Sequence, residues 1–233
     1  MRITAVIPAY NEKPNIVQLT SKLQQALAKC CQKFDIVYVY EGSDGGEKLL
    51  EDMVNEHGSL LVKYSPDPLG IGGALKEGFH LAPESSTHIL TMDADLSHDP
   101  DDILKLVQAS RTADIVIGSR YVDHGKFDQM PAVQKMISRL ANATVSRAFD
   151  VSVKDLSSGF RLYNKDSIIH IRDRVKSNDY GFFPESLIIA SKLGYEIAEV
   201  PITYHRRACG VSKLNLLKTG RAYANLLLSN PAK

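Results

Sequence analysis

The sequence carries no excess of charge of either sign. Its 28 Lys and Arg residues and 27 Asp and Glu residues give a formal net charge of +1. A protein dedicated to nucleic acid usually has a basic excess, which attracts the phosphate backbone. We therefore expect no nucleic-acid partner.

Cysteines and long apolar runs are also scarce. The three cysteines, Cys30, Cys31 and Cys209, are odd in number, and adjacent cysteines seldom pair, so no disulfide framework is indicated. We expect a reducing, cytoplasmic setting. No run of about 18 apolar residues occurs, and the strand-like residues 2–7 leave no room for a secretory signal, so we expect no membrane-spanning segment. Without repeats or clear linkers, the 233 residues predict one domain.

What the sequence does contain is an alternation of short β-branched runs with segments of helical period. Pro14 and apolar residues at helical spacing predict a helix over residues 14–31, and a second helix is expected over residues 131–149. The strand-like runs recur roughly every 25 to 30 residues, as in βαβ units, at residues 3–7, 36–40, 60–64, 87–92 and 115–118. We expect an α/β fold with a mostly parallel twisted sheet, helices on both faces, and ligand sites at the carboxyl ends of the strands.

Two carboxylates stand at such a strand end, in residues 91–100, which read TMDADLSHDP. In an extended backbone Asp93 and Asp95 would project to the same side, with the small Ala94 between them, and could converge on one cation. Such hard oxygen ligands suit Mg²⁺ or Mn²⁺, whose shell a substrate's phosphates would complete. Alternatively, a polar residue at 95, 97 or 99 simply caps a helix that begins at Pro100.

Six ordered segments resemble glycosyltransferase family 2, and within it the dolichyl-phosphate (polyprenyl-phosphate) mannose synthases and their glucose-transferring relatives. They are residues 6–12 (VIPAYNE), 70–74 (GIGGA), 92–98 (MDADLSH), 118–121 (GSRY), 158–163 (SGFRLY) and 207–213 (RACGVSK). The resemblance implies a nucleotide-binding fold of the GT-A type, a nucleotide-sugar donor, Mg²⁺ or Mn²⁺ as cofactor, and a polyprenyl or dolichyl phosphate as acceptor.

The resemblance also implies roles for individual residues. At the nucleotide sugar it places Pro8, Tyr10, Glu12, Val39, Glu41, Asp93, Ala94, Asp95, Arg120, Arg207 and Lys213. The metal would be held by Asp93, Asp95 and Ser97, and the acceptor phosphate by Arg120 and Ser138. The catalytic set would be Asp93, Asp95, Arg207 and Lys213. Without the resemblance, the basic residues would be solvated surface and the glycines at 70–73 purely structural.

The expected reaction is an inverting transfer, with mannose from GDP-mannose first and UDP-glucose as the competing donor. A phosphate monoester has a second pKa of about 6, so it is anionic near neutrality and needs no dedicated base. The product of an α-linked donor would then be β-linked. A same-fold transferase with another acceptor and a catalytically silent nucleotide-binding subunit are the alternatives. A dinucleotide oxidoreductase is set aside, because no G-x-G-x-x-G turn follows the first strand.

Three departures from the family pattern qualify this expectation. Tyr40 and Glu41 stand where two aspartates are usual, Ser97 stands where many relatives carry Gln, and Gln134 stands where Arg is common. The first puts the base and sugar in doubt, and the last weakens acceptor-phosphate binding unless Lys135 or Arg139 substitutes. Either Arg206 or Arg207 could match the arginine of the family motif. The spacing back from residues 210–213 favours Arg207.

The chain divides by expectation into three parts. Residues 1–121 form the nucleotide-sugar half, residues 122–211 the acceptor side, and residues 212–233 an amphipathic helix that mixes leucines with Lys and Arg. That helix is either interfacial or packed on the core. We expect a peripheral protein at the cytosolic face of a membrane, held there by its own surface or by a small membrane-anchoring subunit.

Overall fold

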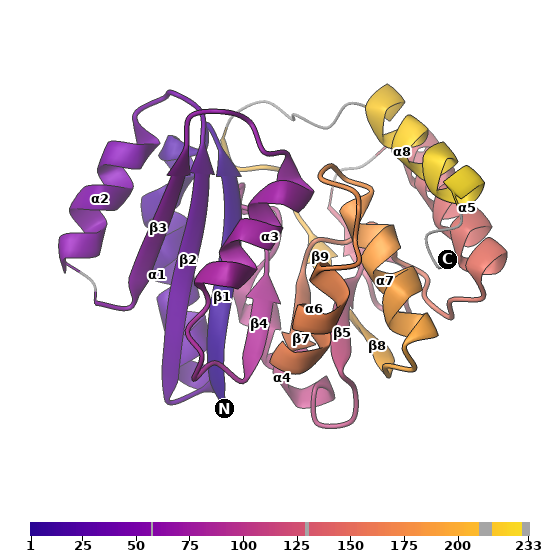
Figure 1. Cartoon of the computed structure of the whole chain (residues 1–233), viewed down its shortest axis with the longest axis horizontal. Helices are drawn as coiled ribbons and strands as arrows, with labels where there is room; N and C mark the ends of the chain where they lie inside the picture. Colours follow the sequence, from indigo (N-terminus) through magenta and orange to yellow (C-terminus); the bar gives the residue numbers. More distant parts are fainter. Residues whose placement is uncertain (57, 129–130, 210–215, 230–233) are drawn as a thin grey trace.

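The computed structural model describes residues 1–56, 58–128, 131–209 and 216–229. Its larger sheet has the strand order β3-β2-β1-β4-β7-β5-β8, and β6 pairs with β9 beside it (Figure 1). The strands are β1 (Arg2–Tyr10), β2 (Lys33–Glu41), β3 (Leu60–Ser65), β4 (His88–Thr91), β5 (Ile115–Ser119), β6 (Lys126–Phe127), β7 (Arg161–Asn164), β8 (Ile197–Pro201) and β9 (Thr203–Tyr204). The helices are α1 (Lys13–Cys30), α2 (Gly46–Glu56), α3 (Ile71–Leu81), the 3-10 turn η1 (Pro100–Asp102), α4 (Ile103–Ala109), α5 (Ala132–Phe149), α6 (Lys165–Arg172), α7 (Phe182–Lys192) and α8 (Leu216–Ser229).

All five strands expected from the sequence are present in the sheet. β1 pairs in parallel with β2 and with β4, β2 pairs in parallel with β3, and β5 pairs in parallel with β8. The exception to the parallel pattern is β7, which lies antiparallel between β4 and β5. The prediction of a mostly parallel sheet is therefore confirmed, with one reversed strand inserted at its centre.

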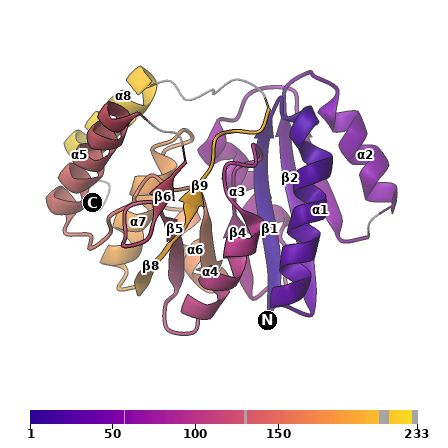
Figure 2. The ribbon, with the colours of Figure 1, turned by 180° about the vertical axis from the view of Figure 1, so that it is seen from behind.

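Helices cover both faces of this sheet, as Figures 1 and 2 show from opposite sides. Leu19 and Leu23 of α1 and Leu106 of α4 pack with Ile3 and Ile7 of β1 on one face. On the other face, α3, α6 and α7 pack against residues that alternate with these along the strands, such as Val6 and Val37. Full burial of such a side chain contributes about 1.5–3 kcal/mol, so each helix is fixed by several of these contacts.

The two long helices α1 and α5 match the sequence expectations closely. Pro14 occupies the first turn of α1, where its missing N–H costs nothing. Helix α5 ends at Asp150, whose φ of 53° lies in the left-handed region that terminates helices.

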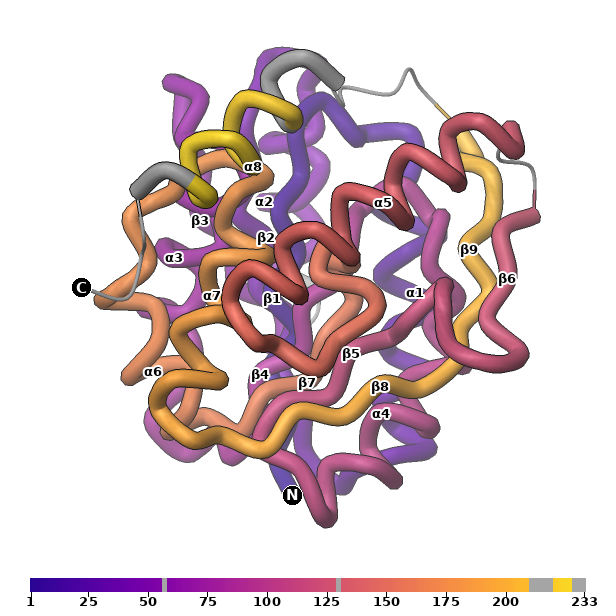
Figure 3. Tube along the Cα trace, turned by 90° about the vertical axis from the view of Figure 1, so that its right-hand side faces the viewer, coloured from indigo at the N-terminus to yellow at the C-terminus, as the bar shows by residue number. Residues whose placement is uncertain are grey.

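Helix α8 packs beside α5 at one end of the molecule (Figure 3). Its residues Ala222, Tyr223 and Leu226 are buried, so the described part of the C-terminal helix packs on the protein. Residues 210–215 and 230–233 lie outside the described chain. The sequence left two alternatives for this amphipathic segment, an interfacial helix or a helix packed on the core. Residues 222, 223 and 226 pack on the core.

Candidate functional site

The acidic pair lies in a turn immediately after β4, at the carboxyl edge of the sheet. Asp95 accepts a hydrogen bond from the Ser97 main-chain N–H at 2.9 Å, and Leu96 has a φ of 63°. The backbone at the pair is a turn and not the extended strand that we expected, yet the carboxylates lie close enough for the charge of Asp95 to raise the pKa of Asp93. Asp95 is buried, whereas the Asp93 side chain keeps 30% of its surface exposed.

Arg207 ties this turn to the end of the first strand. Its Nη1 donates to Glu12 Oε1 at 2.7 Å, and its Nη2 lies 3.0 Å from Asp95 Oδ2. The Ala208 N–H also donates to the Asp95 carbonyl at 3.1 Å, which holds this segment along the acidic turn. Arg206 is exposed, whereas Arg207, which spacing favoured, lies at the acidic turn. Lys213, the other predicted cation of this segment, lies outside the described residues.

Two of the predicted nucleotide-binding residues, the buried Glu12 and the exposed Tyr10, lie at the end of β1 and in the turn that follows it. Glu12 is 5% exposed, and its second carboxylate oxygen accepts from Asn15 Nδ2 at 2.7 Å. Tyr10 is 42% exposed at the same strand end, and Pro8 is half-buried. This geometry leaves the Tyr10 ring accessible to a planar ligand, while Glu12 is positioned by its neighbours.

The end of β2 presents Glu41 to the site but turns its neighbours away. Glu41 accepts the Leu69 N–H at 3.1 Å, and burial raises the pKa of its carboxyl. Val39 is fully buried and packs in the core on the α3 face. Only the main chain of Val39 remains to serve the predicted nucleotide contact.

Tyr40 stands where the family pattern usually has an aspartate. It lies on the opposite face of β2 from Glu41. Its side chain is fully buried, and its hydroxyl donates a hydrogen bond to Asp44. A Cβ on Gly46 would meet that hydroxyl at 2.1 Å, so the ring fills the space beneath the start of α2. Tyr40 is thus a packing residue.

Arg120 forms a buried ion pair with Asp155, a partner that no sequence motif indicated. It grips Asp155 from Nε at 2.8 Å and from Nη2 at 2.7 Å, and the same Nη2 donates to Ser157 Oγ at 2.7 Å. Asp155 is fully buried, and Arg120 holds the pKa of its carboxyl below the ordinary value despite the burial. The Arg120 guanidinium also lies 5.3 Å from the centroid of the Tyr204 ring. It is a rigid cation beside the acidic turn.

Ser97 and His98 are buried polar residues whose side chains lack partners. Among the described residues, neither the Ser97 hydroxyl nor either ring nitrogen of His98 makes a hydrogen bond. The His98 Nδ1 lies 3.8 Å from Asp93 Oδ2, and its ring packs against Phe160 and Tyr204. Burial lowers the pKa of His98, so the ring is neutral. Buried polar groups are normally satisfied, so these atoms indicate that something else belongs here.

The electrostatics of the acidic turn favour a cation. Burial and the neighbouring Asp95 raise the pKa of the Asp93 carboxyl well above its ordinary value. Burial, followed by the charge of Asp93, raises the pKa of Tyr180 and of Tyr204 to about 12. Gly159 stands close by, because a Cβ there would meet Asp93 Oδ1 at 3.0 Å. A divalent metal would relieve this concentration of negative charge.

The donor set fits a metal that is completed by a substrate. Within residues 1–56, 58–128, 131–209 and 216–229, no three His, Cys, Asp or Glu side chains converge as a closed metal site. Asp93, Asp95 and the Ser97 hydroxyl, which makes no hydrogen bond among the described residues, would instead supply part of an oxygen shell. Mg²⁺ and Mn²⁺ are commonly bound in this way, with phosphates and waters as the remaining ligands.

The glycine-rich segment at residues 70–74 has a packing role. The N–H groups of Gly72 and Gly73 both donate to the Asn178 carbonyl, at 2.9 and 3.2 Å. A Cβ on Gly70 would meet the same carbonyl oxygen at 2.4 Å, and Gly70 has a φ of 74°. The structural alternative therefore holds for these glycines.

Ser138 lies half-buried on α5, next to a cluster of aromatic rings and cations. Burial raises the pKa of the Tyr121 hydroxyl, and the nearby Ser138 side chain opposes this rise. Arg139 lies 5.4 Å from the centroid of the Tyr121 ring, and Lys135 lies 5.4 Å from that of Phe127. Arg120 lies 5.7 Å from the same Tyr121 centroid, so Tyr121 joins the predicted acceptor residues. Gln134 is exposed.

Asp155, His98, Tyr180 and Tyr204 belong to the site although sequence reasoning did not select them. Asp155 begins a segment whose later residues matched the family, and His98 closes the acidic segment. The only available signal was this adjacency to matched motifs. Their roles depend on contacts between segments far apart in the chain.

Comparisons with known proteins agree with this arrangement. Residues 4–172 match the model of glycosyl transferase family 2. The chain is 34% identical over 229 residues to an undecaprenyl-phosphate mannosyltransferase of Micrococcus luteus, covering 97% of this chain and 93% of that one. It is 31% identical over 219 residues to a polyprenol monophosphomannose synthase of Mycolicibacterium smegmatis, covering 92% and 81% respectively.

Among solved structures, the fold is similar to glucosyl-3-phosphoglycerate synthase from Mycobacterium tuberculosis in complex with Mn²⁺, UDP-glucose and phosphoglyceric acid. The TM-score is 0.68 at 19% identity, with 99% of this chain and 79% of that chain covered. The mixed sheet flanked by helices is a nucleotide-binding fold of the GT-A type. The chain belongs to glycosyltransferase family 2. It is a glycosyltransferase, and both relatives named above are mannosyl-transferring enzymes that act with polyprenyl phosphates by name.

Proposed function

We propose that this enzyme transfers mannose from GDP-mannose to a polyprenyl phosphate in a metal-dependent, inverting reaction. The observation that carries the proposal is the joining of Glu12, Asp95 and Arg207 at the carboxyl edge of the sheet, in a chain 34% identical to a named undecaprenyl-phosphate mannosyltransferase. Carboxylates that can hold a metal and an arginine that can bind phosphate meet there. Binding of a nucleoside diphosphate requires both.

The donor would lie across the ends of β1, β2 and β4. The exposed Tyr10 would cover a base or ribose, Glu12 would accept hydroxyl or guanidinium donors, and Glu41 would face the base. Asp93, Asp95 and Ser97 would hold Mg²⁺ or Mn²⁺, which when bound stabilises the charge on the departing diphosphate. Arg207 supplies a cation at the same place, and Lys213 is proposed to join it.

The acceptor side needs cations rather than a base. A phosphate monoester is already anionic near neutrality, so the protein must bring two anionic groups together and offset their repulsion. Arg120, held rigidly by Asp155, and Ser138 on α5 are the residues we assign to the acceptor phosphate. Because the Gln134 side chain has no charge, Arg139 and Lys135 on the same helix face become the remaining cations for this task.

Membrane contact would come from α5. Val133, Met136, Ile137 and Leu140 follow helical spacing, and their exposed fractions are 63%, 65%, 58% and 68%. The basic residues Lys135 and Arg139 lie between them in sequence, a combination typical of helices that lie in a membrane interface. Within the part of the chain that the structure describes, no helix is long and apolar enough to cross a membrane. We therefore propose peripheral attachment through this face, with a membrane-anchoring subunit as an additional aid.

The test is transfer of labelled sugar from GDP-mannose and from UDP-glucose, in parallel, to a polyprenyl phosphate, with Mg²⁺, with Mn²⁺ and with chelator. We expect mannose transfer that chelator abolishes, and a β-linked product by NMR. Transfer only from UDP-glucose would change the donor, and an α-linked product would exclude a single displacement.

A same-fold transferase with another acceptor is the second candidate, and Gln134 is the observation that favours it. It predicts metal-dependent hydrolysis of the donor or transfer to a soluble phosphate in the same assay, with none to the lipid. The silent-subunit alternative loses its main support, because Tyr40 lies outside the site.

A further inference from the structure

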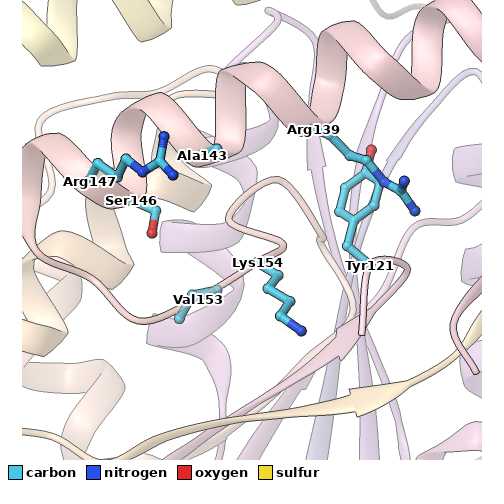
Figure 4. A pocket seen from close by; sticks show the side chains of 7 residues that line it. All are labelled: Tyr121, Arg139, Ala143, Ser146, Arg147, Val153 and Lys154. Carbon is cyan, nitrogen blue, oxygen red and sulfur yellow. The ribbon is translucent and has the colours of Figure 1, made fainter. Parts of the chain in front are cut away.

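A hollow of about 260 Å³ opens beneath α5 (Figure 4). We call it the α5 hollow. It is lined by Tyr121, Arg139, Ala143, Ser146, Arg147, Val153 and Lys154. Helix α5 contributes one row of these residues, and Val153 and Lys154 line the hollow from the segment that follows the helix, with the Lys154 side chain pointing away from α5.

The α5 hollow concentrates positive charge that the described protein does not neutralise. Arg139, Arg147 and Lys154 form no ion pair with any carboxylate among the described residues. The acids that follow in the chain are already engaged. Asp155 is held by Arg120, and Glu199 accepts the N–H groups of residues 154 and 155 at 2.8 and 3.0 Å. The cations are therefore available to an external anion.

The remaining walls are apolar or occupied. Val153 is buried, the Tyr121 ring lies against Arg139, and the Ser146 hydroxyl is used on the Val151 carbonyl. Ligand pockets of about 300–1,000 Å³ are typical for drug-sized molecules. The α5 hollow is smaller, so it suits a phosphate with its first few attached atoms rather than a nucleotide sugar.

The exposed apolar face of α5 begins at the rim of the α5 hollow. Leu140 is three residues before Ala143 and seven before Arg147, so the apolar row and the cationic row are neighbours on the helix surface. An anion carrying hydrocarbon chains would place its charge in the hollow and its chains along Met136 and Leu140. A free anion would use only the hollow.

We propose that the α5 hollow binds the phosphate of an anionic membrane phospholipid at the end that carries Arg147, away from the end at Tyr121 and Arg139 that adjoins the acceptor side. The proposal rests on the proposed function in one respect, that α5 faces the membrane. Arg147 and Lys154 would anchor the headgroup, whereas Arg139 and Tyr121 remain with the acceptor side. This contact fixes how the enzyme sits on the bilayer, so that the side containing Arg120 and Ser138 meets the lipid surface.

The experiment compares two double variants of the full chain by vesicle flotation. The first, Arg147→Gln with Lys154→Gln, removes two positive charges from the α5 hollow. Lys126→Gln with Arg221→Gln removes the same charge from exposed positions on the neighbouring β6 and α8. Vesicles are phosphatidylcholine with and without phosphatidylglycerol. Circular dichroism and thermal melting confirm that both variants fold.

We expect the hollow variant to lose about thirtyfold in affinity for the anionic vesicles, about fivefold for each cation, and the control variant to lose much less. Equal losses would mean diffuse attraction between the surface and the bilayer and would overturn the proposal. Calorimetric titration with inorganic phosphate separates the other source of the same chemistry. Phosphate binding that the hollow variant lacks, with unchanged flotation, would make the hollow a free-anion site and would also overturn it.

Sugar transfer in detergent distinguishes this proposal from the proposed function. We expect both double variants to transfer as well as the unmodified enzyme, because none of the four substituted residues is assigned to the donor, the metal or the acceptor phosphate. A loss confined to the hollow variant would assign the hollow to the acceptor phosphate and contradict the proposal. If the unmodified enzyme transfers nothing, the proposed function fails, while the flotation result still decides the hollow.

Discussion

His98 carries two ring nitrogens that find no partner among the described residues, although the side chain is almost fully buried. Leaving a buried polar group unsatisfied costs about 1–3 kcal/mol, so a role for it is expected. In the tautomer that carries a proton on Nδ1, a small closure of the 3.8 Å gap would make a hydrogen bond to Asp93. Such outer contacts orient metal-binding carboxylates. We interpret His98 as a positioning residue for Asp93.

The first prediction is that His98→Phe weakens Mn²⁺ binding about 10- to 100-fold, the usual effect of losing an outer-shell partner. His98→Gln, which keeps a donor, should lose much less. Mn²⁺ affinity is measured by electron paramagnetic resonance with a nucleoside diphosphate present, so the readout does not depend on turnover. Equal Mn²⁺ affinity for the unmodified protein and His98→Phe would show that the ring only fills space.

The second prediction concerns Asp93 and pH in the metal-free protein. Because the pKa of its carboxyl is raised on folding, the folded chain keeps a proton that the unfolded chain has already released between the ordinary carboxyl range and neutrality. Stability from this group is therefore present at low pH and lost as pH rises. Asp93→Asn cannot titrate, so in chelator its melting temperature should exceed that of the unmodified protein at about pH 8 and approach it at about pH 5.

The comparison of the two proteins removes the opposing effect of His98, whose lowered pKa acts in the other direction. A melting difference that stayed constant from acid to alkaline pH would show that Asp93 does not titrate abnormally. It would also weaken the argument that this turn awaits a cation.

Residue identity at the site could be predicted from motifs, but residue pairing could not. Spacing selected Arg207 over Arg206, and the structure brings Arg207 to Glu12 across a sequence separation of 195 residues. The partner of Arg120 is Asp155, which no local pattern distinguishes from other surface acids. Val39 was expected at the nucleotide, yet strand alternation puts its side chain in the core. Such pairings depend on sheet order, which a motif does not encode.

At the scale of elements, hydrophobic period predicted the parallel strands and the long helices because each is decided by local spacing. The reversed strand β7 was missed, since its four residues look like any short apolar run. Its direction follows from where the chain returns after α5. Residues 155–160 bring it back at the carboxyl edge, so β7 must run down between β4 and β5.

The third prediction concerns the exposed apolar face of α5. Ile137→Gln with Leu140→Gln should reduce flotation with vesicles about tenfold or more, because a fully buried side chain of this size contributes about 1.5–3 kcal/mol. The matched control is Val17→Gln with Leu104→Gln, which changes side chains that are 56% and 46% exposed on α1 and α4. All four are surface positions, so thermal stability should hardly change. Equal flotation of the two variants would place the membrane contact elsewhere.

At the scale of the whole molecule, the site depends on three separated parts of the chain meeting at one edge of the sheet. The turn after β1 supplies Glu12, the turn after β4 supplies the acidic pair, and the segment after β9 supplies Arg207. At the far end, α5 and α8 pack together and carry the apolar face and the α5 hollow. The edge that carries the acidic pair and the end that carries α5 are joined through Arg120, whose partner Asp155 directly follows Lys154 of the hollow in the chain.

This arrangement predicts that metal and nucleotide stabilise the protein together. A ligand at about 100 times its dissociation constant adds about 2.7 kcal/mol to folding stability, and about 1 kcal/mol shifts the melting temperature by about 2–4 °C for a chain of this size. GDP with Mn²⁺ should therefore raise the melting temperature by about 5–10 °C. GDP with chelator should give only a small part of that increase, because the Asp93–Asp95 turn repels a bare diphosphate.

Asp95→Asn should remove the metal-dependent part of the increase, whereas Asp123→Asn, at an exposed loop position, should retain it. Comparing UDP with GDP in the same scan ranks the two bases at Glu41, and an increase that is indifferent to chelator would mean that the acidic pair does not hold the metal.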